Sequence, residues 1–180
     1  MTNLLETIDA ITNAMEEGSR VLLIFLDFAK AFDKVCHRSL EAKLVTYGFS
    51  KYTLNWVNDF LRNRKQRVVI GNNQSNWSDV TSGVPQGSCL GPLLFVIFIN
   101  DMPKVVKHIL KLFADDSKLI GIIKNSIDLE ILQNDIDELT KWSRDWRMMF
   151  HPENCKVMDI NNKGESQPSL TMKTQTLDIN

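Results

Sequence analysis

Two adjacent aspartates, Asp115 and Asp116, interrupt an otherwise apolar stretch at residues 111–121. The flanking runs are short and carry few polar residues, which predicts two strands joined by a tight turn. Gly, Asn and Pro, the usual turn residues, are absent from the turn itself. Neighbouring carboxylates at a strand tip repel each other and need cations to be stable together. An isolated Asp-Asp pair is most often a solvated turn, so the pair alone does not establish a site.

A third carboxylate occupies a similar position upstream. Asp27 directly follows the apolar run at residues 21–26, which predicts a central strand because both of its faces are apolar. Asp27 and Asp115 are 88 positions apart (115 − 27), so only the fold can bring them together. Mg²⁺ takes one or two carboxylates per ion plus water and substrate oxygens, so three aspartates suffice for a two-metal phosphoryl-transfer site.

Composition narrows the class of protein. The chain has 180 residues, of which 43% are hydrophobic and 24% charged, as expected for one globular domain with a real core. The net charge of −1 gives no support for nucleic-acid binding by the chain as a whole, so any such surface must be local. No Cys or His spacing suggests zinc.

The same data predict an intracellular protein, nuclear or cytoplasmic and not secreted. The three isolated cysteines favour a reducing compartment. The N-terminus lacks the pattern of a secretory signal, and no apolar run is long enough to span a membrane, so no membrane partner is expected.

Hydrophobic periodicity and turn residues predict an α+β fold. The predicted order is α-β-αα-ββ-α-ββ-α-β, which favours an antiparallel sheet covered by helices on one face. Ser50 is expected to cap a helix. The predicted helices are 4–16, 37–48, 51–62, 93–102 and 126–149, and the predicted strands are 20–27, 67–70, 77–80, 108–114, 117–123 and 155–160, with a weak strand signal at 170–177.

Four motifs resemble those of reverse transcriptases, and of non-LTR (LINE-like) retrotransposons in particular. The first runs from Asp27 through Phe-Ala-Lys-Ala-Phe to Asp33, and the third is Phe113-Ala-Asp-Asp116. The second, Ser82-Gly-Val-Pro-Gln-Gly-Ser-Cys-Leu-Gly-Pro-Leu-Leu-Phe95, is long and specific. The fourth comprises Trp142, Trp146 and Asn154-Cys-Lys156-Val-Met158. The motifs occur in the family's order over residues 20–160.

The resemblance implies an RNA-directed DNA polymerase palm that transfers nucleotides from a dNTP to a primer 3′-hydroxyl. It identifies Asp27, Asp115 and Asp116 as carboxylates for two Mg²⁺ ions, which Mn²⁺ could replace. Phe32 matches the ring beneath the sugar of the incoming nucleotide, although a buried Phe is the simpler interpretation. Gln86 and Gly87 match the loop near that nucleotide, where a plain turn is the alternative.

Two further sets of residues carry weaker hypotheses. Lys156 is a candidate general acid for the pyrophosphate leaving group, and a surface lysine is an equal alternative. Four cations fall within six positions and form either a phosphate-contacting patch or the solvated end of a hairpin. These cations are Arg62, Arg64, Lys65 and Arg67.

The expected domain organisation is a palm at residues 20–160. Residues 1–19 would be a helix left from the fingers connection, and 161–180 a polar tail that starts a primer-grip hairpin, with fingers and thumb largely missing. The expected partners are an RNA template, a DNA primer, dNTP and a longer polyprotein with an endonuclease. A degenerate palm that binds RNA or protein without catalysis, a relic without function, and, more distantly, a Mg²⁺ hydrolase remain open.

Overall fold

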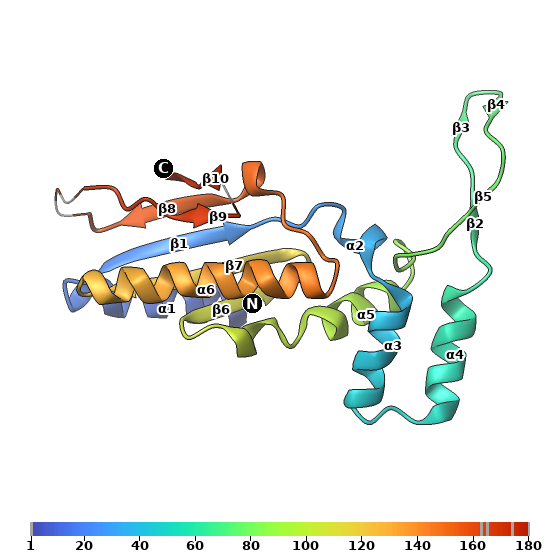
Figure 1. Ribbon diagram of the computed structural model, residues 1–180, viewed down its shortest axis with the longest axis horizontal. Helices are drawn as coiled ribbons and strands as arrows, with labels where there is room; N and C mark the ends of the chain where they lie inside the picture. The colour runs from blue at the N-terminus through green and yellow to red at the C-terminus, as the bar shows by residue number, and fades with distance from the viewer. Residues whose placement is uncertain (1, 163, 165, 174, 180) are drawn as a thin grey trace. The chain divides into compact units, whose positions relative to one another are not determined.

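The computed structural model describes residues 2–162, 164, 166–173 and 175–179. The chain divides into two compact units, one formed by residues 1–29 and 100–180 and the other by residues 30–99. The first unit holds a five-stranded sheet in the order β11-β8-β1-β7-β6 (Figure 1). These strands are β1 (Arg20–Leu26), β6 (Ile109–Phe113), β7 (Asp116–Ile123), β8 (Lys156–Ile160) and β11 (Asp178–Ile179).

The central strand β1 is buried on both faces. It pairs antiparallel with β7, where Leu26 lies opposite Ser117, and with β8, where Phe25 lies opposite Lys156. Only Phe25 of its seven residues is not fully buried. Arg20 starts the strand and remains buried because its guanidinium binds both carboxylate oxygens of Asp159, at 2.9 and 2.6 Å.

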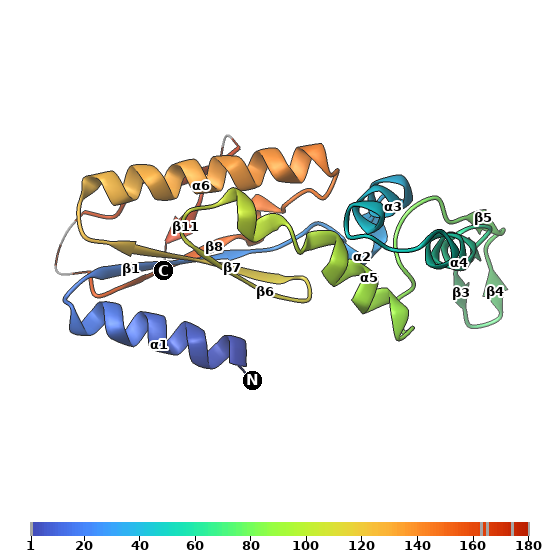
Figure 2. The same cartoon turned by 90° about the horizontal axis from the view of Figure 1, so that it is seen from below.

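Helices lie on both faces of this sheet, on opposite sides in Figure 2. Ile120 packs in one cluster with Ala14 of α1 (Thr2–Glu16). A Cβ added to the next residue, Gly121, would meet Leu132 of α6 (Ser126–Asp145) on the other side. The predicted α+β class with an antiparallel-dominated sheet is confirmed, whereas the helical cover differs from the one face expected, because both faces of β1 are apolar and need burial.

Helix α6 is the longest element and begins with a capping box. The Asn125 side chain accepts hydrogen bonds from the backbone N–H groups of Ile127 and Asp128, at 2.9 and 3.3 Å, and the Asp128 carboxylate accepts from Asn125 N at 3.0 Å. The helix ends at Asp145 rather than 149 because Arg147 adopts a left-handed backbone conformation, with φ 56°.

Replacing Asn125 by alanine is expected to lower the free energy of unfolding by about 1 kcal/mol, because the cap bonds are lost. Asn134→Ala is the matched control, since Asn134 lies exposed within α6, where alanine is the better helix former. Urea denaturation of both variants measures the difference. Equal unfolding midpoints for the two variants would contradict the cap's role.

Residues after β8 contribute to the core of the first unit. Leu170, Met172 and Leu177 are buried. The Gln133 side chain donates to Thr171 O and accepts from Thr171 N, both at 2.9 Å. The predicted strand signal corresponds to β9 (Thr171–Met172) and β10 (Gln175–Thr176), and β11 adds a strand parallel to β8. Positions 163, 165, 174 and 180 of the predicted tail lie outside the described residues.

The second unit comprises helices and an extended ribbon. Its helices are α2 (Ala31–Lys34), which the sequence did not predict, α3 (His37–Thr46), α4 (Lys51–Leu61) and α5 (Leu90–Ile99). Ser50 caps α4 as predicted, accepting from Thr53 N at 3.3 Å. The predicted helix over 93–102 ends earlier, at Ile99, and is followed in the first unit by a 3₁₀ turn, η1 (Met102–Val105), before β6. A second 3₁₀ turn, η2 (Pro152–Asn154), precedes β8.

The predicted hairpin at 67–80 forms two short ladders instead of one. Strand β2 (Lys65–Gln66) pairs with β5 (Ser78–Asp79), and β3 (Val69–Ile70) pairs with β4 (Asn73–Gln74). Between them, Val68 N donates to the Ser75 side chain at 2.9 Å rather than to a backbone carbonyl. Ser75 N donates in turn to Val68 O at 2.9 Å, so the two segments remain joined between the ladders.

Candidate active site

Asp27 is held at the end of β1 by the segment that precedes β8. Its carbonyl accepts a hydrogen bond from His151 N at 2.9 Å, and its Oδ2 accepts one from Asn154 Nδ2 at 2.8 Å. Phe28 stacks on Phe150, with ring centroids 4.7 Å apart. Asn154 was part of the quoted fourth motif but received no predicted role, because sequence spacing did not show that its amide reaches Asp27.

Asp115 and Asp116 lie exposed at the tip of the β6–β7 hairpin. Phe113 pairs with Asp116, which leaves Ala114 and Asp115 as the two turn residues. Ala114 has φ 52°, a left-handed conformation that costs a residue with a Cβ about 1–2 kcal/mol. The surrounding ladder holds this strained turn, as often occurs at functional sites.

The strand register brings two of the predicted carboxylates to neighbouring positions. Leu26 lies opposite Ser117, so continuing the antiparallel register by one residue places Asp27 opposite Asp116. Asp115 precedes Asp116 in the turn. Carboxylate oxygens are the ligands that Mg²⁺ prefers, so the donor chemistry fits the predicted metal. Among the described residues, however, no group of three His, Cys, Asp or Glu side chains is arranged to hold an ion.

A cavity of about 310 Å³ opens beside Asp116. Phe113 lies on its rim and is 70% exposed. Lys118 also lines it, and its ammonium lies 5.8 Å from the centre of the Phe25 ring. The remaining lining residues are Asn3 and Leu4. The carboxylate therefore faces a partly apolar space with one cation close by.

Lys156 lies opposite Phe25, two residues before Asp27. Its ammonium forms an ion pair with Asp178 at 2.6 Å; the Asp178 side chain is mostly exposed and that of Lys156 is half-buried. A general acid must reach the group that it protonates. The contact with Asp178 turns the ammonium toward β11, so the role predicted for Lys156 stays a prediction and would require this exposed pair to open.

The first and second motifs meet in the second unit. Gly83 N donates to Val35 O and Val84 N to Phe32 O, both at 2.8 Å, while the Ser82 hydroxyl donates to Asp33 O at 2.8 Å. The Phe32 ring is half-buried and stacks on Phe95, with centroids 4.7 Å apart. Phe32 therefore has a packing role, and one that leaves part of its ring accessible.

Gln86 lines a cavity of about 440 Å³ in the same unit. Gln86 and Gly87 are both exposed. The cavity brings the predicted nucleotide loop together with two members of the basic cluster, Arg64 and Lys65, which sequence spacing did not indicate. Its other lining residues are Asp33, Gln66, Val80, Ser82, Gly83, Val84 and Pro85.

The four cations of the basic cluster differ in their contacts. Arg64 donates to Gly83 O at 2.6 Å and to Leu61 O at 3.1 Å, so it ties the ribbon to the second motif. Lys65 lies 3.9 Å from Asp79. Arg62 is exposed, and Arg67 lies over the ring of Trp77. A structural role accounts for Arg64, which leaves Arg62 and Arg67 as the more accessible cations for phosphate.

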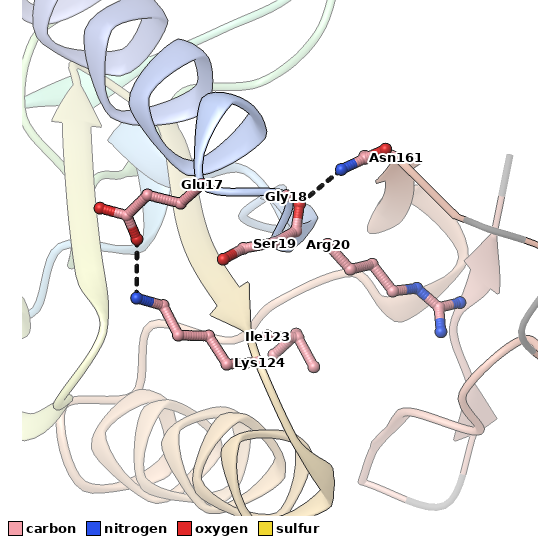
Figure 3. Close-up of a pocket in the computed structure, with 7 residues that line it drawn as sticks. All are labelled: Glu17, Gly18, Ser19, Arg20, Ile123, Lys124 and Asn161. Carbon is pink, nitrogen blue, oxygen red and sulfur yellow. Dashed lines mark hydrogen bonds and ion pairs between the residues drawn. The ribbon is translucent and has the colours of Figure 1, made fainter.

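A separate cavity of about 300 Å³ lies at the opposite end of β1 from Asp27 (Figure 3). Glu17 and Lys124 pair across it at 2.7 Å, and the hydrogen bond from Lys124 lowers the pKa of Glu17. Asn161 donates to Ser19 O at 2.9 Å. The one carboxylate that lines this cavity, Glu17, is paired with Lys124, whereas Asp115 and Asp116 are adjacent carboxylates at a hairpin tip.

Cys155 lies buried beside Asp27, and burial raises the pKa of its thiol. Because the thiolate is the reactive form, Cys155 is expected to be alkylated by iodoacetamide at pH 8 far more slowly than exposed Cys89. Peptide mass spectrometry over time measures both rates. Denatured protein, in which both thiols should react alike, is the control, and equal rates in the folded chain would contradict the burial of Cys155.

The antiparallel sheet of the first unit carries Asp27 at the end of β1, and Asp115 and Asp116 at the tip of the adjacent hairpin. The sequence profile of the family described as reverse transcriptase (RNA-dependent DNA polymerase) matches residues 2–175. The chain belongs to this family. Among the residues described, no helix has the length and apolar character needed to cross a bilayer.

Relatives from mobile elements cover most of the chain. The RNA-directed DNA polymerase from mobile element jockey of Drosophila melanogaster is 29% identical over 168 residues, 88% of this chain and 18% of that protein. The probable polymerase from transposon X-element of the same species is 27% identical over 94% of this chain. The Pol polyprotein from the R2 element of Popillia japonica is 24% identical over 87%. The chain spans 18–28% of these relatives' own lengths.

Two solved structures share the fold. Apo telomerase from Candida Tropicalis, truncated from its C-terminal domain, aligns with a TM-score of 0.68 and 13% identity, over 96% of this chain and 37% of that chain. Telomerase of the same species in complex with a fragment of telomeric RNA aligns with a TM-score of 0.62 and 14% identity, over 93% of this chain and 31% of that chain. The predicted polymerase palm is therefore confirmed as a fold.

Proposed function

We propose that this chain is the polymerase domain of a non-LTR retrotransposon and transfers dNMP from dNTP to a primer 3′-hydroxyl on an RNA template, releasing pyrophosphate. The proposal is supported by the register of β1 and β7 in a member of the reverse transcriptase family. Leu26 lies opposite Ser117, and Asp27 and Asp116 are the next residues beyond that pair. Residues 20–160 form the palm in this proposal, with 1–19 leading from the fingers and 161–180 leading to a primer grip.

Asp27, Asp115 and Asp116 would hold two divalent cations, Mg²⁺ or Mn²⁺. When bound, the ions neutralise triphosphate charge and activate the primer hydroxyl. The protein supplies a fixed position for one carboxylate, because Asn154 and His151 hold Asp27 from two sides. The other two carboxylates lie exposed at the hairpin tip, Asp115 in the turn and Asp116 at the start of β7.

The remaining site residues would select and orient substrates. The accessible part of Phe32 would exclude a 2′-hydroxyl and thus favour deoxynucleotides. Gln86 and Gly87 would border the nucleotide and its template partner, while Arg62, Lys65 and Arg67, with Arg64 behind them, would contact template phosphates. Lys156 would donate a proton to pyrophosphate once released from Asp178.

The relatives and the cysteines support a proposal for the polyprotein context and the cellular location of this chain. Their much greater length supports a polyprotein context, which we propose includes an endonuclease. Three cysteines that form no disulfide, Cys36, Cys89 and Cys155, support an intracellular location in the nucleus or cytoplasm.

The alternative is a palm that binds RNA or protein without catalysis. It is favoured by the lack of a preassembled metal group among the described residues and by the pairing of Lys156 with Asp178. In this alternative, binding would survive loss of the aspartates and would depend instead on Arg62, Arg64 and Lys65.

The test is incorporation of a single labelled dNMP into a DNA primer on an RNA template, with the purified chain in excess over the primer. We expect slow incorporation that follows the template base and requires Mg²⁺ or Mn²⁺, because fewer substrate contacts position the reactants in an isolated palm. Tight RNA binding without any incorporation would favour the non-catalytic alternative. Robust multi-nucleotide extension would contradict the expectation of weak activity.

A further inference from the structure

The ribbon formed by β2 to β5, residues 65–79, exposes an unusual amount of apolar surface; we name it the arm. Val68, Val69, Ile70 and Trp77 are 62, 54, 74 and 59% exposed. The arm extends beyond the end of α4 in Figure 1. A lone two-stranded ribbon is only marginally stable, and grouped apolar side chains on a surface mark interaction sites. The arm therefore has the properties of a surface that a partner covers.

Charge identifies the partner as a polyanion. Residues 62–80 contain four cations and one carboxylate, Asp79, for a local net charge of +3 (4 − 1), whereas the whole chain carries −1. Arg64 is engaged by backbone carbonyls, and Lys65 lies near Asp79. Arg62 and Arg67 supply the remaining positive charge, next to the exposed apolar residues. Single-stranded nucleic acid offers the matching combination of phosphates and unpaired bases.

Arg67 and Trp77 together offer a contact for a phosphate and a contact for an unpaired base, side by side on the arm. The guanidinium carbon lies 4.6 Å from the centre of the indole ring. This cation–π contact orients the guanidinium, whose planar donors suit a phosphate. Because Trp77 stays 59% exposed with Arg67 over it, the ring retains surface on which a base can stack. Amide side chains at the tip, exposed and able both to donate and to accept, are Asn72, Asn73, Gln74 and Asn76.

We propose that the arm binds single-stranded RNA, with Trp77 stacking on an unpaired base while Arg67 contacts an adjacent phosphate. The choice of RNA rests on the proposed function, in which RNA is the template. The arm contributes little discrimination among bases, because an indole ring stacks on any of them.

The main test compares Trp77→Leu with Trp77→Phe. Both substitutions keep apolar bulk, but only phenylalanine retains an aromatic face. Fluorescence anisotropy with a labelled, unstructured RNA of about 12 nucleotides should show a dissociation constant about tenfold higher for Trp77→Leu and little changed for Trp77→Phe. A blunt RNA duplex of the same length should bind all variants alike, because its bases are already stacked. A DNA strand of the same sequence tests the choice of RNA.

Tyr52→Leu is the matched control. Tyr52 is 88% exposed on α4, in the same unit and outside the arm, so its loss should leave RNA affinity unchanged. Salt dependence separates the roles of the two arm residues. Arg67→Ala should reduce the slope of log Kd against log salt concentration by about 0.7, the value for one phosphate contact on a single strand, while Trp77→Leu, which keeps the charge of Arg67, should reduce the slope by less.

Several results would overturn the proposal. They are failure of the wild-type chain to bind single-stranded RNA, equal affinity of Trp77→Leu and wild type, an equal loss on single strands and duplexes, or an equal loss in Tyr52→Leu. Tighter binding to DNA than to RNA would refute the choice of RNA. The dNMP incorporation assay tests the carboxylate site, whereas the Trp77 comparison tests RNA binding by the arm. A wild-type chain that incorporates no dNMP would still allow the Trp77 comparison. A chain that incorporates dNMP but whose RNA affinity does not depend on Trp77 would refute the arm proposal alone.

Discussion

Replacing Asp115 and Asp116 together by asparagine is expected to abolish divalent-cation binding and dNMP incorporation. At 4 Å, each carboxylate attracts a divalent ion by about 2 kcal/mol even at the dielectric constant of water. Removal of two carboxylates should therefore raise the dissociation constant for Mn²⁺ roughly 1000-fold. Titration of the purified chain followed by electron paramagnetic resonance of free Mn²⁺ measures this change directly.

The matched control is Asp9→Asn with Asp59→Asn, which removes the same charge from exposed positions on α1 and α4. This control should bind Mn²⁺ like the wild type. The Asp115/Asp116 variant should unfold at the same temperature as the wild type or higher, because repulsion between neighbouring carboxylates is relieved. Unchanged Mn²⁺ binding in that variant would refute the proposed metal site.

Gly83→Ala is expected to lower the free energy of unfolding by about 3 kcal/mol. Gly83 has φ +85°, and an added Cβ would lie 2.8 Å from three backbone atoms of Phe32 and Asp33. The left-handed conformation contributes about 1 kcal/mol and overpacking against immobile backbone about 2 kcal/mol. The bonds that join the second motif to α2 would be distorted, so the position of Phe32 would also be lost.

Gly87→Ala separates these two effects. Gly87 has φ +82°, but no atom lies within 4 Å of the added Cβ. Its substitution should cost only the conformational part, about 1 kcal/mol. Urea denaturation monitored by circular dichroism gives both values. If the two variants lost the same stability, the close contact between the second motif and α2 would not be significant.

The strongest predictions from the sequence depended on long, regular patterns. The strand before Asp27 and the helix α6 were predicted correctly because each has a regular pattern of apolar residues over many positions. In the strand the apolar residues are consecutive, and in the helix they recur along one face. The prediction that helices cover only one face of the sheet was wrong, although both faces of β1 are apolar. Helical periodicity shows that a helix has an apolar face but does not reveal on which side of a sheet it packs. The four-residue α2 was missed, since an element this short owes its stability to tertiary bonds with Gly83 and Val84.

Side-chain partners were the least predictable part of the site. The contact of Asn154 with Asp27 joins residues 127 positions apart, and that of Lys156 with Asp178 depends on a parallel strand only two residues long. Arg64 is similar in sequence context to Arg62, yet it is engaged by the Gly83 carbonyl. Such contacts depend on how the backbone brings distant segments together, which spacing along the chain does not encode.

The order in which the strands of the first unit are synthesised affects how it folds. Leu26 pairs with Ser117, 91 residues later (117 − 26), and β8 follows later still. At about 5–20 residues per second, a ribosome takes roughly 5–20 s to produce the first of these partners. During that interval the most apolar strand of the sheet is without either neighbour. The nascent chain is therefore most prone to aggregation before the partners of β1 are synthesised.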